Sequence, residues 1–248
     1  MKKTASIVLT LLLCMVMTSC SKTAREEKRL LKGMMSENYE TSAKALSEFI
    51  TWMQTDKATM NHDFQLMREK LGMKIVNSPD SLVRCYSWVT GQFENNASYA
   101  NIIQWMTEGH FVGYSGPIDH LLAGREANLK AQETLAHSID TIFEIRFGKQ
   151  PVYLIAQSYT NRKGFRRAYV SASTIAALSL RLLPFFFDGT EIAGNNEFID
   201  EANVPIGDLF KWDEKNRLFY AYQVDDSSRL IPGQYTIYKL GEKNFVKQ

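Results

Sequence analysis

Histidine, cysteine and acidic side chains are the residues of this chain that could hold a metal ion. None of the four histidines stands three or four residues from another, the spacing that places two ligands on one face of a helix. The chain also has no H-E-x-x-H segment and no cluster of cysteines. No glycine-rich loop of the kind that cradles a phosphate or a dinucleotide occurs. We therefore expect neither a metal ion nor a cofactor.

Paired carboxylates are the remaining route to catalysis. A glycosidase needs two carboxylates roughly 5 to 10 Å apart, and Asp188 with Glu191, or Asp200 with Glu201, could form such a pair. Both pairs stand in turn-like stretches with Gly or Asn, where acidic residues are common. Gly113–Gly116 lacks the spacer of the G-x-S-x-G nucleophile elbow. The sequence favours a protein that is not an enzyme.

Aromatic side chains offer a binding role instead, because exposed rings stack on sugars and anchor peptides. Trp88 and Trp105 are expected on neighbouring strands, close to Tyr86. Packing in the core is the more common role for such residues. A ring that faces outward among these three would be the best candidate for stacking on a ligand.

The first twenty residues have the pattern of an export signal. A basic start, Met1–Lys3, precedes the apolar run Ile7–Met17 and a small-residue end. The run is shorter than the roughly 20 residues that cross a bilayer, and no later stretch is long and apolar enough to do so. Met17–Cys20 resembles a bacterial lipobox, in which the cysteine receives fatty acyl chains such as palmitate and becomes the first residue. We expect residues 1–19 to be a lipoprotein signal peptide and Cys20 to be the lipidation site.

The cysteine count agrees with lipidation. Cys14 leaves with the signal, and an unmodified Cys20 would need a partner for Cys85 in an oxidising compartment, where cysteines occur mostly in pairs. Lipidation of Cys20 removes that need. Cys85 lies in an apolar run and is expected to be a small buried hydrophobe.

The charge balance excludes a general attraction to nucleic acid. Removal of residues 1–19 takes away Lys2 and Lys3 and no acid, so 29 basic and 27 acidic residues become 27 and 27. Nucleic-acid binding needs a basic surplus gathered on one face. The densest basic run, residues 162–167, is expected at a solvated hairpin tip, and we expect no nucleic-acid partner.

The periodicity divides the mature chain into three parts. Residues 20–29 are almost wholly polar and are expected to be a tether, with the start of an exposed helix as the alternative for residues 21–29. Residues 30–72 carry apolar positions at three- and four-residue spacing, which predicts a helical segment. Residues 73–248 shift to period two and to β-branched and aromatic residues, which predicts a β-rich domain.

Within the β-rich domain, residues 118–138 are expected to be a helix. Short strands separated by turns favour antiparallel pairing over a βαβ arrangement. The fold class is therefore α+β: N-terminal helices followed by a mainly antiparallel domain, sandwich or barrel-like. The expected strands span residues 82–89, 99–106, 141–146, 152–159, 165–173, 178–187, 209–212, 218–224 and 235–240.

Two segments carry a resemblance to a family. Residues 78–88 and 101–105 are similar to an S-x-D-x-x-x-R-x-Y-S-W segment and a following N-I-I-Q-aromatic strand in an uncharacterised family of Bacteroidota lipoproteins. The likeness spans about residues 60–240. The chain departs from the family at residues 92–96, where the family has Gly-Gly-Thr. The resemblance implies a cell-envelope location and this fold, and it implies no particular activity.

Two short motifs resemble sites at which these bacteria O-glycosylate exported proteins. They are Asp80-Ser81-Leu82 and Asp140-Thr141-Ile142, which makes Ser81 and Thr141 candidate glycosylation sites. Ser81 follows a Pro-Asp turn and is expected to be the more exposed of the two.

These observations favour a lipid-anchored protein of the cell envelope, on the periplasmic or the surface face of the outer membrane. We expect a non-catalytic binding or structural module that contacts the membrane through its lipid and binds a glycan or a protein. An envelope hydrolase acting on glycans or peptides, with its acids brought together by the fold, is the alternative. A third interpretation is an assembly partner that docks through the N-terminal helices.

Overall fold

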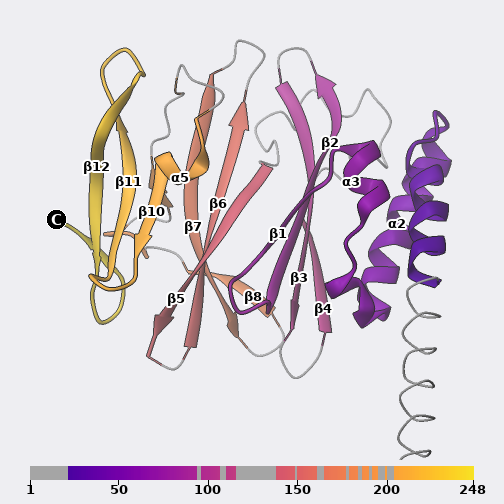
Figure 1. The fold of residues 1–248 in the computed structure, drawn as a ribbon, viewed down its shortest axis with the longest axis horizontal. Helices are drawn as coiled ribbons and strands as arrows, with labels where there is room; N and C mark the ends of the chain where they lie inside the picture. Colours follow the sequence, from indigo (N-terminus) through magenta and orange to yellow (C-terminus); the bar gives the residue numbers. More distant parts are fainter. Residues whose placement is uncertain are drawn as a thin grey trace, which may run out of the picture.

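Four layers stacked face to face make up the protein in a computed structural model (Figure 1). A helical layer is followed by three antiparallel sheets, here called sheets A, B and C in chain order. The structure describes residues 22–93, 96–106, 110–115, 138–148, 150–160, 165–176, 179–183, 186–189, 192–194, 199 and 204–248. The expected helix at 118–138 lies outside the described residues, apart from its last residue, which begins a strand.

The helical layer comprises a helix at residues 22–34, α2 (Tyr39–Thr55), the 3-10 helix η1 (Lys57–Asn61) and α3 (Gln65–Leu71). Asn38 caps α2, because its Oδ1 accepts the backbone N–H of Thr41 at 2.9 Å. The expected tether is wrong for residues 22–29. These residues form the first two described turns of a helix that buries Thr23 and Glu27.

Sheet A has the strand order β1 (Lys74–Asn77), β2 (Val83–Phe93), β3 (Asn96–Met106) and β4 (His110–Ser115). Successive side chains of a strand point to opposite faces, so each face of sheet A carries alternate residues. One face packs against the helices through Tyr86, Trp88, Ala100 and Ile102. The other packs against sheet B through Val83 and Cys85.

Sheet B contains β5 (Ser138–Phe147), β6 (Gln150–Thr160), β7 (Arg166–Ala176) and β8 (Ser179–Leu182), and β9 (Ile192–Gly194) also pairs with β7. It is covered on both faces. Five consecutive residues of β6, Val152 to Ala156, are buried, alternately facing sheet A and sheet C. A continuous apolar run of this kind is typical of a strand with no solvent-facing side.

Sheet C has the order β10 (Phe210–Asp213), β11 (Leu218–Val224), β12 (Leu230–Leu240) and β13 (Phe245–Lys247), and the short helix α5 (Ile206–Leu209) precedes it. Its inner face buries Phe210, Phe219 and Phe245 against sheet B. Burial of a phenylalanine side chain stabilises the fold by about 1.5 to 3 kcal/mol. These three rings therefore hold sheet C to the stack.

The predicted α+β class is confirmed, with three open sheets rather than a closed barrel. β4 is a strand that the expected set does not include. The strand expected at 178–187 ends at Leu182.

Candidate functional site

The aromatic residues expected to be ligand candidates lie inside the protein. Tyr86 is fully buried and Trp88 is 4% exposed, both in the core between sheet A and the helices. Trp105 is half-buried and lies on the opposite face of the same sheet, toward sheet B. The three rings therefore do not share a surface. Neighbouring side chains cover Tyr86 and Trp88, so these two rings have the more common role, packing in the core, and neither faces outward to stack on a ligand.

Tyr86 belongs to a polar network that joins sheet A to the helices. Its hydroxyl donates to Oε1 of Gln104, whose Nε2 donates to Oγ1 of Thr59 at 2.9 Å and to the backbone oxygen of Met53 at 3.2 Å. Burial raises the pKa of Tyr86, so the hydroxyl keeps its proton. This network is a means of docking the helices and leaves no group directed to a ligand.

Arg84 extends the same network. Its guanidinium donates to the backbone oxygens of Thr59, Met60 and His62, and it lies 5.2 Å from the centre of the Tyr86 ring. Those oxygens end the 3-10 helix η1, where a cation is favourable.

The residues predicted to be modified differ in accessibility. Ser81 is exposed at a turn with φ of 60°, and Asp80 fixes that turn by accepting from Leu82 N at 3.0 Å and from the Tyr153 hydroxyl at 2.8 Å. Thr141 is half-buried in β5 beside a register shift. Cys20 lies outside the described residues, whereas Cys85 is buried, which raises the pKa of its thiol.

The described acidic residues form no metal cluster. Asp188 is exposed, and Glu191, Asp200 and Glu201 lie outside the described residues. Asp140 has a buried carboxylate, which pairs with Lys74 at 2.5 Å and with Arg166 at 3.1 Å, and its side chain is 6% exposed.

The expectation of a solvated tip at residues 162–167 is wrong for Arg166. This side chain is buried and also donates to Ser158 Oγ at 3.1 Å and to the backbone oxygen of Val204. Together with Lys74 of β1, it ties sheet A to sheet B through Asp140. The cluster of Lys74, Asp140 and Arg166 therefore joins two sheets inside the protein.

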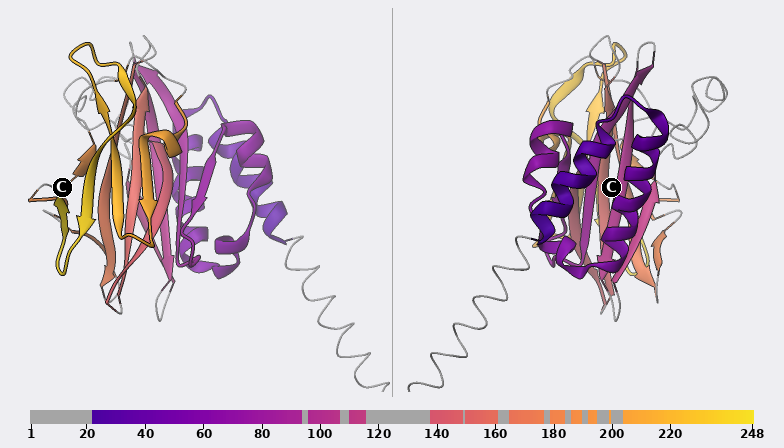
Figure 2. Two further views of the ribbon diagram at one scale, coloured as in Figure 1. Left: turned by 60° about the vertical axis from the view of Figure 1, so that its left-hand side comes forward. Right: turned by 90° about the vertical axis from the view of Figure 1, so that its right-hand side faces the viewer.

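The outer face of sheet C is the surface on which binding groups gather. Directly paired residues of neighbouring strands share a face, so the register places Lys211, Tyr220 and Ile237 side by side. Tyr235 lies two residues before Ile237 and on the same face. The face comprises Lys211, Asp213, Leu218, Tyr220, Tyr235, Ile237, Lys239 and Val246. Tyr222, which pairs with Tyr235, does not belong to it, because Tyr222 is 3% exposed and its hydroxyl donates to the backbone oxygen of Ala168 in sheet B. No described residue forms a layer over it, as the left-hand view of Figure 2 shows.

Contacts within this face fix its central side chains. The rings of Tyr220 and Tyr235 meet edge to face with 5.9 Å between their centres, and the ammonium of Lys211 lies 4.7 Å from the centre of the Tyr235 ring. A hydrogen bond with Tyr235 raises the pKa of Lys211, so the side chain remains a cation. The Tyr235 hydroxyl donates to the backbone oxygen of Asp208 at 3.2 Å. Two phenol rings and one ammonium group are thus held in place at half-exposed positions.

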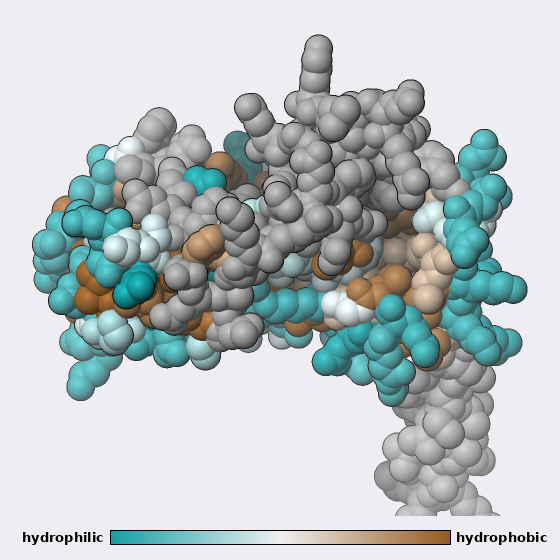
Figure 3. Space-filling model, turned by 90° about the horizontal axis from the view of Figure 1, so that it is seen from above, coloured by the Kyte–Doolittle hydropathy of each residue, from teal (hydrophilic) through white to brown (hydrophobic). Residues whose placement is uncertain are grey.

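A pocket of about 250 Å³ adjoins Tyr235. The pairing of β11 with β12 runs from Tyr222↔Tyr235 directly to Val224↔Leu230, which makes residues 231–234 bulge from β12. Gly233 has φ of 75°, a conformation that a side chain would strain, and it lets the bulge turn. The bulge and Asp208 of α5 form the walls of the pocket. Seen from above, hydrophobic surface is exposed at this end of the stack (Figure 3).

The carboxylate on this face is unsuited to acid catalysis. Asp213 accepts hydrogen bonds from the backbone N–H of Asn216 at 3.0 Å and from its side-chain amide at 2.7 Å. These bonds lower the pKa of Asp213. A general acid needs the opposite shift, so the chemistry of this face is stacking, hydrogen bonding and attraction of a negative group.

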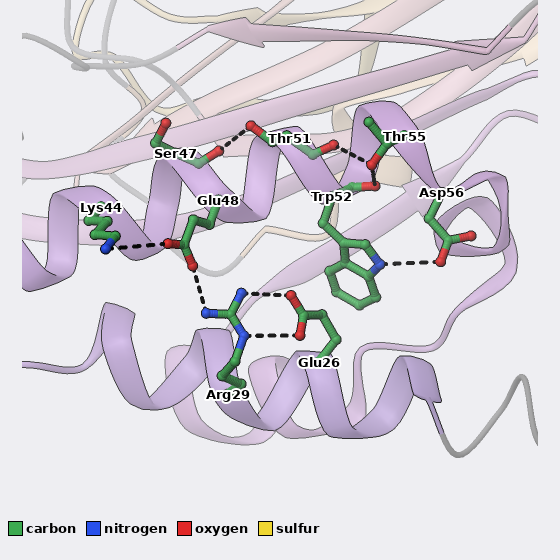
Figure 4. A network of polar contacts seen from close by, with 9 residues as sticks. All are labelled: Glu26, Arg29, Lys44, Ser47, Glu48, Thr51, Trp52, Thr55 and Asp56. Carbon is green, nitrogen blue, oxygen red and sulfur yellow. Dashed lines mark hydrogen bonds and ion pairs between the residues drawn. The ribbon is translucent and has the colours of Figure 1, made fainter.

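A second hollow of about 930 Å³ lies between the helix at residues 22–34 and α2. Figure 4 shows that its charged groups are joined across the two helices. Arg29 contacts Glu26 and Glu48, both at 2.6 Å, and Nε1 of Trp52 donates to Asp56 at 3.3 Å. The Arg29–Glu48 pair joins the two helices, whereas Arg29–Glu26 lies within the first helix and Trp52–Asp56 at the end of α2.

The alternation in residues 218–224 and 235–240 could have shown a two-sided sheet with aromatic residues on both faces. The sequence could not say which face another layer covers. Comparison with known proteins adds nothing: no protein-family model, no curated protein and no solved structure matches the chain. Among the helices that the structure describes, none is long and apolar enough to cross a membrane.

Proposed function

We propose that this protein is a lipid-anchored module of the cell envelope that binds a glycan or a protein partner, without catalysis, through the outer face of sheet C. One observation carries the proposal. The two faces of sheet B, both faces of sheet A and the inner face of sheet C are covered by neighbouring layers, whereas the outer face of sheet C meets no described layer. That face holds Tyr220, Tyr235 and Lys211 in fixed positions.

The position of this face supports binding away from an anchor. The helix that begins at residue 22 belongs to the layer at one end of the stack, and sheet C is the layer at the other end (Figure 1). Sheets stacked face to face lie about 10 Å apart, so the outer sheet lies roughly 20 Å from sheet A, and the helices lie further away. A lipid on Cys20 would thus leave sheet C free to meet a partner.

Aromatic rings give most to binding when they are exposed and held in one orientation, because little side-chain freedom is then lost in the complex. The rings of Tyr220 and Tyr235 are half-exposed, and their contact with each other and with Lys211 holds them in one orientation. The ammonium of Lys211 adds attraction for a carboxylate or a sulfate on the partner. The combination suits an acidic glycan or an acidic, aromatic-rich protein surface.

Binding of the chain from Ser21 to arrays of envelope and host polysaccharides, followed by titration of the strongest ligand, tests the proposal. We expect Tyr220→Ala with Tyr235→Ala to weaken binding about thirtyfold, since anchor residues contribute roughly 2 kcal/mol or more each and are not additive. Leu182→Ala is the matched control, because Leu182 is 49% exposed on β8 in sheet B. Unchanged affinity in the double variant would contradict the proposal, and release of reducing ends from a bound glycan would favour the hydrolase alternative.

A further inference from the structure

A stripe of cations runs along the helix at residues 22–34. An α-helix advances about 100° per residue, so Lys22, Arg25, Lys28, Arg29 and Lys32 fall within an arc of roughly 120°. All five side chains are exposed. We call these five residues the basic stripe.

The docking of the helix fixes the direction of the basic stripe. Glu27 on the opposite side is 2% exposed; its carboxylate accepts the backbone N–H of Met67 at 3.0 Å and contacts Nε2 of His62 at 2.8 Å. Leu30 is fully buried on the same side. The basic stripe therefore lies on the side of the helix opposite Glu27 and Leu30, where Lys22, Arg25 and Arg29 also line the hollow beside α2. The right-hand view of Figure 2 shows this helix on the outer side of the helical layer.

Most of the stripe is not neutralised by the protein. Arg29 pairs with Glu26 and Glu48, whereas Lys22, Lys28 and Lys32 form no ion pair with any described residue. The charge of the rest of the chain is of the opposite sign. Residues 22–34 hold five basic and two acidic residues, and residues 35–248 hold 22 basic and 25 acidic ones. The first helix thus has a basic surplus, whereas the rest of the helical layer, residues 35–72, holds four basic and six acidic residues.

We infer that the basic stripe lies on a bilayer surface and binds the phosphate groups of anionic lipids. The inference rests on the proposed lipid anchor at Cys20. The basic stripe begins two residues after Cys20, and a chain this short holds the helix within reach of the lipid headgroups. A single hydrophobic signal gives reversible attachment, and a neighbouring basic patch strengthens it. With the stripe on the membrane, the stack stands on its helical layer and sheet C points away from the bilayer.

The test is sedimentation of the chain from Ser21, which has no acyl group, with vesicles. Every described residue lies in this chain, and its folding is checked by circular dichroism. We expect binding to phosphatidylcholine vesicles that contain phosphatidylglycerol, loss of that binding in high salt, and no binding to phosphatidylcholine alone. Combined Lys22→Gln, Lys28→Gln and Lys32→Gln should lower the partition coefficient about a hundredfold, since each cation near an anionic surface contributes roughly fivefold.

The matched control removes three exposed lysines from the sheet C end, by Lys215→Gln, Lys243→Gln and Lys247→Gln. It changes the net charge by the same amount, so we expect it to keep most of the binding. Equal binding to both kinds of vesicle, no binding to either, or an equal loss in the control variant would overturn the inference. The other two proposals have separate tests. The lipid anchor is tested by the membrane retention of Cys20→Ala, and partner binding is tested by the affinity of the Tyr220 and Tyr235 variants.

Discussion

Arg84 is a cation buried without a carboxylate partner among the described residues. It is 6% exposed, donates to three backbone oxygens at the end of η1, and lies 6.0 Å from the centre of the Phe64 ring and 5.2 Å from that of Tyr86. Burial lowers the pKa of Arg84, which still remains charged at neutral pH. The side chain is therefore a positioning element that joins sheet A to the helical layer.

Replacement of Arg84 should strongly destabilise the protein. Arg84→Ala leaves the backbone oxygens of Thr59, Met60 and His62 without their donor, and buried groups that lose a charged partner cost about 3 kcal/mol or more. Urea unfolding measures this loss, and Arg68→Ala, which removes an exposed arginine, is the control. A loss below about 1 kcal/mol would contradict the role given to Arg84.

Glu26 should make the docking of the first helix sensitive to acid. Its hydrogen bond with Arg29 lowers the pKa of Glu26 below its ordinary value of 4.5. A carboxyl group whose folded-state pKa is lowered adds stability above its unfolded-state pKa, and this is lost as the pH falls through the folded-state value. Unfolding free energies measured from neutral pH downward should therefore fall less steeply below about pH 4 in Glu26→Gln than in the wild type. Parallel curves would be the contrary result.

Ser81 is the better placed of the two candidate glycosylation residues. It is exposed on a turn that Asp80 holds rigid, whereas Thr141 is half-buried in β5. If the chain is modified in its native cell, intact-mass measurement should show that Ser81→Ala removes the added mass and that Thr141→Ala keeps it. The reverse pattern would assign the modification to the strand.

At the scale of elements, the buried carboxylate of Glu27 joins the helix at residues 22–34 to α3. Glu27 accepts the backbone N–H of Met67 in the first turn of α3, so a side chain from another helix caps a helix whose own first residues provide no cap. Glu27→Ala should cost about 2 kcal/mol and increase hydrogen exchange in residues 22–34 and in α3. Glu37→Ala, at an exposed position before α2, is the control, and equal exchange in both variants would contradict the capping role.

The elements themselves could be predicted in part. Period-two alternation located β2, β3, β6, β7 and β11 to within a few residues, because these strands have strong β-branched and aromatic content. The start of the first helix was predicted only as an alternative, because its exposed face is so rich in charge that residues 22–29 look like a tether. Its buried side depends on Thr23 and Glu27, polar residues that gain partners only from the tertiary structure.

The candidate site could not be predicted for a related reason. The sequence made Tyr86, Trp88 and Trp105 candidates only if one of these rings faced outward, because packing in the core is the more common role for such residues. Whether a face of a sheet is covered depends on which layer packs on it, and that is a property of the whole chain. For the same reason, the sequence could not show that Tyr220 and Tyr235 lie on a face that no described layer covers.

At the scale of the molecule, the stack has two different ends. The helix that carries the basic stripe lies on the outer side of the helical layer, and the aromatic groups lie on the outer face of sheet C. We expect Cys20→Ala to move the protein from the membrane fraction to the soluble fraction, because the basic stripe alone binds reversibly. Cell fractionation with an epitope at the C-terminus measures this, and retention of the variant in washed membranes would argue against the anchor.

The central claim is that the outer face of sheet C meets the partner while the helical end meets the membrane. Hydroxyl-radical footprinting of the acylated protein on vesicles, with and without the bound glycan or protein, tests it most directly. We predict that Tyr220 and Tyr235 are oxidised readily on the membrane-bound protein and become protected when the partner is added. Protection of these two tyrosines by the membrane itself, or protection by the partner at other residues only, would contradict the account.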